Sequence, residues 1–357
     1  TGSGKSLMIY SIVRYLKSIQ KRTLIVVPSK SLVEQMYKDF IDYGWDPEYL
    51  HKIYQGHSLD TSAYVTITTW QSVYGLDKSW FRQFDAVIGD ECHQFKAKSL
   101  QGIMKKMPDC KWRYGFTGTL DGKQVHKLIL EGLFGPVYST VSSSDLMEKG
   151  FLAKLAVEII LLKHPHMTFS TYNDEIEWLG LCDYRNKFIS NLASDLKGNV
   201  LVLFARVEKH GIPLYEMVQD GTDRPVHLVY GMTDIKEREK VREVCKTSDN
   251  NIIVASYGVF STGVNIKNLH HIIFASPSKS KVRVLQSIGR GTRKAKGKED
   301  FKLYDIADDF RKNGGRENFT LKHCAERIEY YVEQDFEYRM TTVPVGMSSS
   351  GSAQLPL

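Results

Sequence analysis

The chain opens on the feature that most constrains its fold, the stretch Thr1-Gly-Ser-Gly-Lys-Ser6. It is the second half of a phosphate-binding loop, because glycines let backbone N–H groups approach an anion closely. The apolar run from Leu7 predicts a helix whose positive end faces that anion. Lys5 would reach the β- and γ-phosphates of a nucleotide, and the Ser6 hydroxyl would ligate Mg²⁺. The predicted nucleotide site consists of Gly2, Ser3, Gly4, Lys5 and Ser6. A glycine-rich turn that merely precedes a helix is the alternative, and later residues decide between the two.

The first half of the sequence alternates short apolar runs with helical stretches. The unbroken apolar run 23–27 is typical of a strand buried on both faces, and further strands are predicted over residues 65–68, 86–89 and 112–116. Polar segments follow the strand ends, as in an open parallel α/β sheet. Such sheets bind ligands at the carboxyl ends of their strands, so these polar segments should lie around the phosphate loop.

Asp90 and Glu91 come directly after the apolar run 86–89. A carboxylate at the end of a buried strand can hold Mg²⁺ together with Ser6, and the next carboxylate can polarise the attacking water. A solvated loop is the common alternative for an Asp-Glu pair. Because an apolar strand precedes this pair and a phosphate loop lies upstream, we interpret Asp90 as a metal ligand and Glu91 as the activator of water.

A second alternation of strands and helices follows residue 184. A helix over 184–196 and strands over 200–204, 226–230, 252–255, 271–274 and 303–306 predict a second α/β sheet, which has no phosphate loop of its own. Between the halves the periodicity is lost, apart from a strand over 156–162. We predict domains at 1–150 and 184–340, a hinge region at 151–183, a long helix over 320–340 and a flexible tail at 341–357.

The second half carries the pattern Gln286-x-x-Gly-Arg290-x-x-Arg293. Two arginines at this spacing lie on one side of a helical turn, so both can point at one anion. A guanidinium stays charged and binds phosphate oxygens bidentately, as an arginine finger requires. We interpret all three residues as catalytic. Neighbouring basic residues are expected to form a solvated surface with a general attraction for phosphates: Lys279, Lys281, Arg283, Lys294, Lys296 and Lys298.

Composition excludes several other classes of protein. No apolar run approaches the roughly 20 residues that a membrane helix needs. The five cysteines lack the spacing of a zinc site, so we expect unpaired thiols in a reducing compartment. The net charge of +7 is compatible with a polyanionic partner but decides little by itself.

The phosphate loop, Asp90-Glu-Cys-His93 and Thr117-Gly-Thr119, in that order, resemble motifs of superfamily 2 helicases. The resemblance implies that His93, Thr117 and Thr119 relay the state of the nucleotide to nucleic-acid binding. It also implies contacts to the backbone of one nucleic-acid strand by Ser29, Lys30, Thr69, Trp70, Gln71 and Thr262, and to the nucleotide by Gly263 and Asn265. Short hydroxyls and loop N–H groups suit phosphate contacts, which need donors and no reading of bases.

The resemblance further implies a P-loop NTPase of the α/β class, with two tandem RecA-like parallel-sheet domains that bind ATP and Mg²⁺ between them. Details such as Ile288-Gly-Arg-Gly-Thr-Arg-Lys294 are similar to the recombination helicases of T4-type bacteriophages. That similarity implies a monomer, in the cytoplasm of a host cell, that acts on branched DNA and on junctions of single strand and duplex. The implied reactions are Holliday-junction branch migration, fork regression, strand annealing, and the unwinding of D-loops and of R-loops with their RNA–DNA hybrids.

Two alternatives stay open at this point. A double-stranded DNA translocase of the restriction-enzyme type would move without separating strands. A nucleic-acid annealing or binding module could keep the fold with a vestigial ATPase. Intact Lys5, Asp90, Glu91, Arg290 and Arg293 argue against this second alternative.

Overall fold

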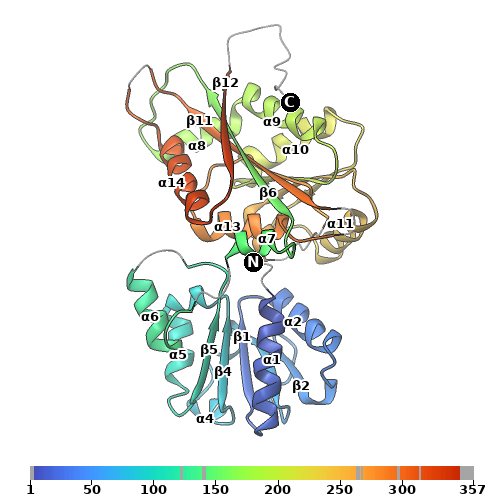
Figure 1. Cartoon of the computed structure of the whole chain (residues 1–357), viewed down its shortest axis with the longest axis vertical. Coiled ribbons are helices and arrows are strands. Elements are labelled where there is room, and N and C mark those ends of the chain that lie inside the picture. Colours follow the sequence, from blue (N-terminus) through green and yellow to red (C-terminus); the bar gives the residue numbers. More distant parts are fainter. Residues whose placement is uncertain are drawn as a thin grey trace. The chain divides into compact units, whose positions relative to one another are not determined.

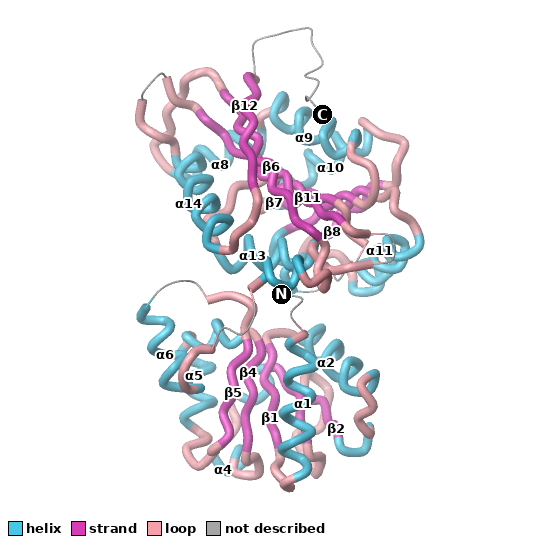
Figure 2. The backbone as a smooth tube through the Cα atoms, viewed as in Figure 1, coloured by secondary structure: helices cyan, strands magenta, loops and turns pink. Residues whose placement is uncertain are grey.

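The computed structural model describes residues 4–120, 124–138, 142–262, 266, 268–295, 298–312 and 315–345. The chain divides into two compact units, Thr1–Val141 and Ser142–Leu357, called unit 1 and unit 2 below. Each unit is a parallel sheet flanked by helices (Figures 1 and 2).

Unit 1 is built on a five-stranded parallel sheet with the order β2-β3-β1-β4-β5. Its strands are β1 (Thr23–Val27), β2 (Leu50–Ile53), β3 (Val65–Thr69), β4 (Ala86–Asp90) and β5 (Trp112–Phe116). Its helices are α1 (Lys5–Ser18), α2 (Lys30–Asp42), α3 (Trp70–Val73), α4 (Lys78–Phe81), α5 (Lys98–Lys105) and α6 (Gln124–Phe134), with short 3₁₀ helices η1 (Pro47–Tyr49) and η2 (Cys92–Lys96).

Each face of this sheet carries its own core, because successive side chains of a strand point to opposite faces. Ile25 and Ile88 pack with the apolar sides of α1 and α2. Leu24 and Val87 point the other way and pack with α5 and α6. β1, β3 and β4 are buried along their whole length, as expected for strands covered on both sides.

Unit 2 is built on a seven-stranded parallel sheet with the order β12-β6-β11-β10-β7-β9-β8. Its strands are β6 (Lys154–Lys163), β7 (Val200–Phe204), β8 (Val226–Val229), β9 (Ile252–Ser256), β10 (His271–Phe274), β11 (Asp300–Asp309) and β12 (Tyr338–Pro344). Its helices are α7 (Ser143–Glu148), α8 (Tyr172–Leu181), α9 (Asp183–Asp195), the π-helical η3 (Val207–Gly211), α10 (Ile212–Asp220), α11 (Ile235–Thr247), α12 (Tyr257–Thr262), α13 (Lys281–Gly291) and α14 (Phe319–Glu333).

The sheet of unit 2 also has a core on each face. Leu203 and Ile253 belong to the cluster formed with α11, α13 and α14. Val202 and Val254 belong to the opposite cluster, formed with α9 and α10. Val284 of α13 is buried in the first of these clusters. This packing fixes the helix that carries the predicted catalytic arginine, Arg290.

The structure departs from the sequence prediction in the presumed hinge and near the end of unit 2. The strand predicted over 156–162 is confirmed as β6. It pairs with β11 along its 10 residues, so the presumed hinge 151–183 carries a strand of the unit 2 sheet. The helix predicted over 320–340 ends at Glu333, because Asp335 takes a positive φ of 54°. Residues 338–344 then form β12, which pairs with β6. This pairing satisfies backbone N–H and C=O groups, and side-chain periodicity gives no signal for it. Of the predicted tail 341–357, residues 341–344 are thus strand and 346–357 lie outside the described residues.

Two predictions from composition can be compared with the structure. In the part of the chain that the structure describes, no helix is long and apolar enough to cross a membrane. The same residues contain no cluster of three or more His, Cys, Asp or Glu side chains that could hold a metal ion. All five cysteines are unpaired and buried, which confirms the predicted thiols: Cys92, Cys110, Cys182, Cys245 and Cys324.

Candidate nucleotide site and arginine turn

The start of α1 has the geometry of an anion-binding helix end. Gly4 precedes the helix with φ 74°, a left-handed conformation that glycine adopts without a Cβ clash. Its carbonyl accepts the N–H of Leu7 at 3.0 Å, so the helix begins directly after it. The first turn carries no acidic side chain, which keeps the positive end of the helix suited to phosphates. Lys5 and Ser6 lie in this turn, partly buried, whereas Gly2 and Ser3 are outside the described residues.

Asp90 and Glu91 lie where β4 ends. The residue before them is Gly89, and the ring of Phe95 packs so closely on it that no larger residue fits there. A Cβ on Gly89 would come within 2.9 Å of the Phe95 ring. Glu91 itself takes the left-handed conformation, with φ 49° and ψ 48°, at the start of η2. For a residue other than glycine this costs about 1 kcal/mol, and such strain is concentrated at functional sites.

The carboxylate of Glu91 joins the phosphate loop to the loop after β5. Lys5 Nζ donates to Glu91 Oε1 at 3.1 Å, and His93 Nδ1 lies 3.4 Å from Glu91 Oε2. The same His93 nitrogen is 2.9 Å from Thr117 Oγ1, and the Thr117 hydroxyl donates to the Thr119 carbonyl at 2.9 Å. Five predicted residues from three separate segments therefore form one chain of contacts.

Asp90 and Glu91 are adjacent, yet their surroundings separate their pKa values. Burial raises the pKa of Asp90 to about 6, and the charge of Glu91 adds to this while that of Lys5 opposes it. Burial also acts to raise the pKa of Glu91. The hydrogen bond from His93 and the charge of Lys5 outweigh it and hold this pKa at about 2. At neutral pH Glu91 is therefore ionised. The higher pKa of Asp90 means that its charge is costly where it is buried, and a nearby cation would stabilise it.

Asp90 and Ser6 supply the oxygen donors that a hard divalent cation prefers. Among the described residues, the hydrogen bond that reaches the Asp90 carboxylate comes from the Glu91 N–H at 2.9 Å, to Oδ1. Mg²⁺ prefers oxygen ligands and keeps several of its waters, so one carboxylate and one hydroxyl form a sufficient donor set beside phosphates. A cation held there would also offset the cost of burying the Asp90 charge.

The predicted nucleic-acid residues of unit 1 lie at the carboxyl ends of β1 and β3. Ser29 immediately precedes α2, and Lys30, its first residue, is exposed. Thr69 ends β3, and Gln71 in α3 is exposed. Trp70 is partly buried against the core that contains α5, so only part of its ring can meet a ligand. The five residues share one edge of the sheet, and their contacts with nucleic acid stay a prediction.

The spacing of the two arginines had suggested that they share one helical turn. In the structure they do not. Gln286 and Arg290 belong to α13, and the guanidinium of Arg290 lies 5.6 Å from the centre of the Phe260 ring. Arg293 lies beyond the end of the helix, in an isolated antiparallel bridge with Leu152. Because α13 ends at Gly291, the side chain of Arg293 leaves from the bridge that follows the helix and not from the helix itself.

Lys298 corrects a second prediction in this region. It was expected on a solvated basic surface, but it is 2% exposed, and its Nζ donates to the backbone carbonyl of Arg293 at 3.0 Å. The backbone carbonyls at and after the end of a helix lack helical partners and need hydrogen-bond donors. The buried ammonium of Lys298 is such a donor. Of the predicted residues after β9, Thr262 is the last residue of α12, and Gly263 and Asn265 lie outside the described residues.

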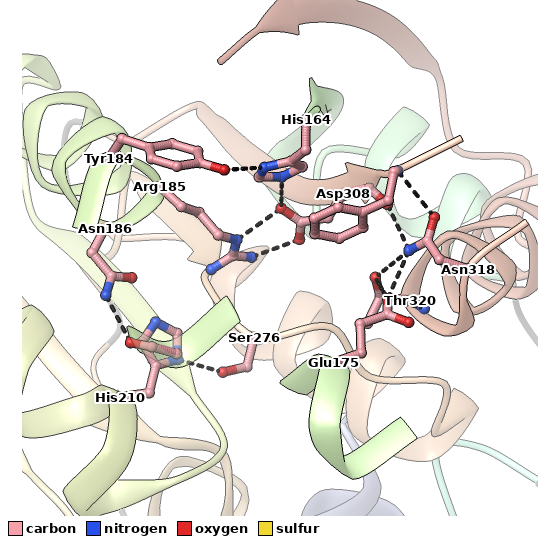
Figure 3. A network of polar contacts seen from close by, with 12 residues as sticks. His164, Glu175, Tyr184, Arg185, Asn186, His210, Ser276, Asp308, Asn318 and Thr320 are labelled. Carbon is pink, nitrogen blue, oxygen red and sulfur yellow. Dashed lines mark hydrogen bonds and ion pairs between the residues drawn. The ribbon is translucent and has the colours of Figure 1, made fainter. Parts of the chain in front are cut away.

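Sequence reasoning missed a network of buried polar side chains in unit 2 (Figure 3). Arg185 of α9 donates twice to Asp308 of β11, at 2.8 and 2.9 Å, and His164 Nε2 lies 2.8 Å from the same carboxylate. These three side chains are fully buried. Beside them, Glu175 of α8 accepts the N–H of Thr320 at the start of α14, at 2.9 Å. The partners lie 123 to 145 residues apart, so no local pattern indicates them.

A second buried pair holds the loop that leads into α13. Arg327 of α14 donates to Asp305 of β11 at 2.8 and 2.7 Å, and the Tyr331 hydroxyl donates to the same carboxylate at 2.7 Å. The adjacent Tyr330 donates to the carbonyl of Lys279 at 2.9 Å, just before α13. α14 thereby positions the start of the helix that carries the catalytic candidates.

Comparison with known proteins finds one matching family model in each unit. The family described as "Type III restriction enzyme, res subunit" matches residues 1–122, and "Helicase conserved C-terminal domain" matches residues 184–295. The ATP-dependent DNA helicase UvsW of Enterobacteria phage T4 is 35% identical over 366 residues, which cover 96% of this chain and 72% of that protein.

Solved structures share the fold at lower identity. Dbp5 of S. cerevisiae, bound to RNA and ADP BeF3, matches with a TM-score of 0.61 and 13% identity over 96% of this chain and 83% of its own. LlaBIII, an ATP-dependent Type ISP restriction-modification enzyme bound to DNA, matches with a TM-score of 0.66 and 14% identity over 98% of this chain and 30% of its own. The predicted fold class, two tandem RecA-like parallel-sheet units, is thus confirmed. The chain belongs to the superfamily 2 helicases, in the family of the phage T4 UvsW helicase.

Proposed function

We propose that this chain is the motor of an ATP-dependent DNA helicase that remodels branched DNA in recombination and repair. The observation that carries the proposal is the chain of contacts from Lys5 through Glu91 and His93 to Thr117. It links the side chain that would bind phosphates, the one that would activate water and the loop that would report to nucleic acid. The printed name of the T4 relative, an ATP-dependent DNA helicase, supports DNA as the substrate.

ATP hydrolysis would use the residues of unit 1 in distinct roles. Lys5 binds the β- and γ-phosphates and exchanges its contact with Glu91 for phosphate oxygens. Ser6 and Asp90 hold Mg²⁺, which when bound neutralises charge on the phosphates. The departure of Lys5 removes one of the interactions that keep the pKa of Glu91 low. Glu91 then becomes a stronger base when substrate is present, and it orients the attacking water.

The arginines of unit 2 would stabilise the charge on the transferred phosphoryl group. An arginine finger is typically worth about 10³–10⁵ in rate. Arg290 and Arg293 take this role in the proposal, and Gln286 assists in orienting the reacting groups. ATP binding would draw the two units together and hydrolysis would release them. Nucleic-acid contacts on both units would convert this cycle into steps along a strand.

The proposed substrates are Holliday junctions, stalled forks, D-loops and R-loops, with strand annealing as an added activity. The protein would act on them as a monomer in the cytoplasm of a host cell. The similarity to UvsW over 96% of the chain supports this choice within the superfamily.

The test is the rate of ATP hydrolysis with single-stranded, duplex, forked and four-way-junction DNA, and with RNA. Branched DNA should stimulate most, and a labelled strand should be released from the fork only with ATP. If no nucleic acid stimulates hydrolysis, the helicase proposal fails. Stimulation by duplex without strand release would instead favour a double-stranded DNA translocase, and annealing that ignores ATP would favour a binding module.

A further inference from the structure

One buried lysine holds the turn that follows α13. Nζ of Lys298 donates to the carbonyl of Gly291 and to that of Arg293, the latter at 3.0 Å. The last carbonyls of a helix have no partner inside the helix, and a cation also suits the negative end of its dipole. A single side chain therefore fixes the backbone on both sides of Thr292.

The same turn is seated on an aromatic ring. Phe301 of β11 lies with its ring centre 5.3 Å from Lys298 Nζ. A Cβ added to Gly291 would come within 2.1 Å of that ring, so the helix end packs against it with no space to spare. Lys298 is thus held between the ring and the carbonyls, where its ammonium can also interact with the ring face.

The other side of the turn is paired with the segment that follows α7. The N–H of Ala153 donates to the carbonyl of Thr292 at 2.8 Å, and Leu152 forms its antiparallel bridge with Arg293. The backbone of Arg293 is therefore held from two sides, by Lys298 and by residues 152–153. These contacts fix the direction of the Arg293 Cα–Cβ bond.

We propose that Lys298 is a positioning residue for ATP hydrolysis, which aims the guanidinium of Arg293 through the backbone of this turn. The proposal rests on the role proposed above for Arg293, because Lys298 acts through that residue and not on the nucleotide. A catalytic group displaced by about 1 Å can cost about 10²-fold in rate. Loss of the ammonium should therefore reduce turnover while leaving the affinity for ATP largely intact.

The geometry also makes the aim of Arg293 sensitive to pH. Burial, and then the charge of Arg293, lower the pKa of Lys298 to about 7. His270, before β10, also interacts with Lys298, and its own pKa is lowered by burial and then by that lysine. The neighbouring Glu299 and Asp300 are exposed. As pH rises through about 7, the ammonium loses its charge, and the carbonyls lose a charge-assisted donor. Turnover should fall on that limb.

Three variants test the proposal in the whole chain. Lys298→Met removes the ammonium and keeps the aliphatic stem, Lys298→Arg keeps a cation at every assay pH, and Lys302→Met changes an exposed lysine of β11 as the matched control. The kcat and KM for ATP are measured in DNA-stimulated hydrolysis between about pH 6 and about pH 9. Lys298→Met should lower kcat by about 10²-fold near pH 6.5, with KM within a few-fold. Lys298→Arg should lose the fall of kcat above pH 7, and Lys302→Met should match the wild type.

A double variant separates failure of this proposal from failure of the proposed function. If Lys298 acts through Arg293, then Arg293→Ala/Lys298→Met is no slower than Arg293→Ala alone. Wild-type turnover in Arg293→Ala would end the role given to that arginine. Lost turnover in Arg293→Ala beside normal turnover in Lys298→Met would end the role of Lys298 alone. If Lys298→Met does not fold, the Lys298→Arg profile decides: an unchanged alkaline limb overturns the proposal, and a flattened one supports it.

Discussion

The two units treat buried carboxylates in opposite ways. In unit 2, Asp308 is 0% exposed and its oxygens receive Arg185 and His164. In unit 1, Asp90 is 8% exposed, and among the described residues its carboxylate receives the N–H of its neighbour Glu91. The pKa values follow: burial acts to raise that of Asp308, but Arg185 and His164 hold it at about 2, whereas burial raises that of Asp90 to about 6.

The contrast separates charges that hold the fold from charges that serve a ligand. A buried carboxylate whose partners are all supplied by the chain stabilises a particular packing of strands and helices. One that still needs a cation is costly to the folded protein until substrate arrives, and such groups are concentrated at functional sites. Substitutions at the carboxylate site of unit 1 should therefore lower turnover, and substitutions in the buried Arg185–Asp308 network of unit 2 should lower stability.

The largest expected effect is on turnover in unit 1. Glu91→Gln keeps the size of the side chain but removes its charge, so DNA-stimulated kcat should fall by about 10²–10⁴-fold. Lys5→Ala should abolish turnover and also weaken the binding of ATP, because the phosphates lose their cation. Steady-state hydrolysis and nucleotide titration measure both effects. Glu48→Gln, at an exposed position, is the control. Normal turnover in either site variant would remove the assignment of this site.

The next effect is on the stability of unit 2. Arg185→Met leaves the buried Asp308 without its bidentate partner and should lower the free energy of unfolding by about 3–5 kcal/mol. The paired variant Arg185→Met/Asp308→Leu removes both charges and should recover most of that loss. Urea unfolding followed by circular dichroism measures both. A single variant as stable as the wild type, or a double variant less stable than the single, contradicts the structural role of the pair.

The parts of the molecule that the sequence predicts are those with a local signal. The strands predicted over 23–27 and 112–116 coincide with β1 and β5, and the polar residues after strand ends include Glu91, His93, Thr117 and Thr119 of the contact chain that begins at Lys5. An apolar run and the residues that follow it are neighbours in the chain. Their meeting at one sheet edge then follows from parallel topology alone.

The parts that escaped prediction depend on partners far away or on the backbone. Arg185 and Asp308 are 123 residues apart, and each resembles an ordinary surface charge when taken alone. Lys298 stands in a run of basic residues, and its burial depends on carbonyls that have no sequence signature. Most side chains of β12 are exposed, as is typical of an edge strand, so no apolar run in the sequence predicts it.

Asp90→Asn should reverse the usual sign of a buried substitution. The folded pKa of Asp90, about 6, lies above the ordinary 3.8. Its contribution to stability is therefore full below about pH 4 and is lost as pH rises through 6. Asn resembles the protonated form, so the variant should be more stable than the wild type by about 1–3 kcal/mol at pH 8, and about equal to it at pH 4. ATP hydrolysis should be lost at both. Urea unfolding at the two pH values provides the measurement, and a variant less stable at pH 8 would contradict the cost assigned to this charge.

The smallest effect compares two glutamates of α8. Glu175 is fully buried and accepts the backbone N–H groups of Phe319 and Thr320, at 2.8 and 2.9 Å, at the start of α14. Glu175→Gln removes the charge that faces the positive end of that helix. It also leaves one carbonyl oxygen for four donors that now share two, because the Asn318 amide and the Thr320 hydroxyl donate there as well. It should lower the free energy of unfolding by about 1–2 kcal/mol. Glu177 pairs with Lys209 on the surface, with 42% of its side chain exposed. Glu177→Gln should therefore change stability by less than about 1 kcal/mol. Equal losses in the two variants would mean that helix capping at α14 contributes no more than a surface ion pair, because both substitutions remove the same charge from the same helix.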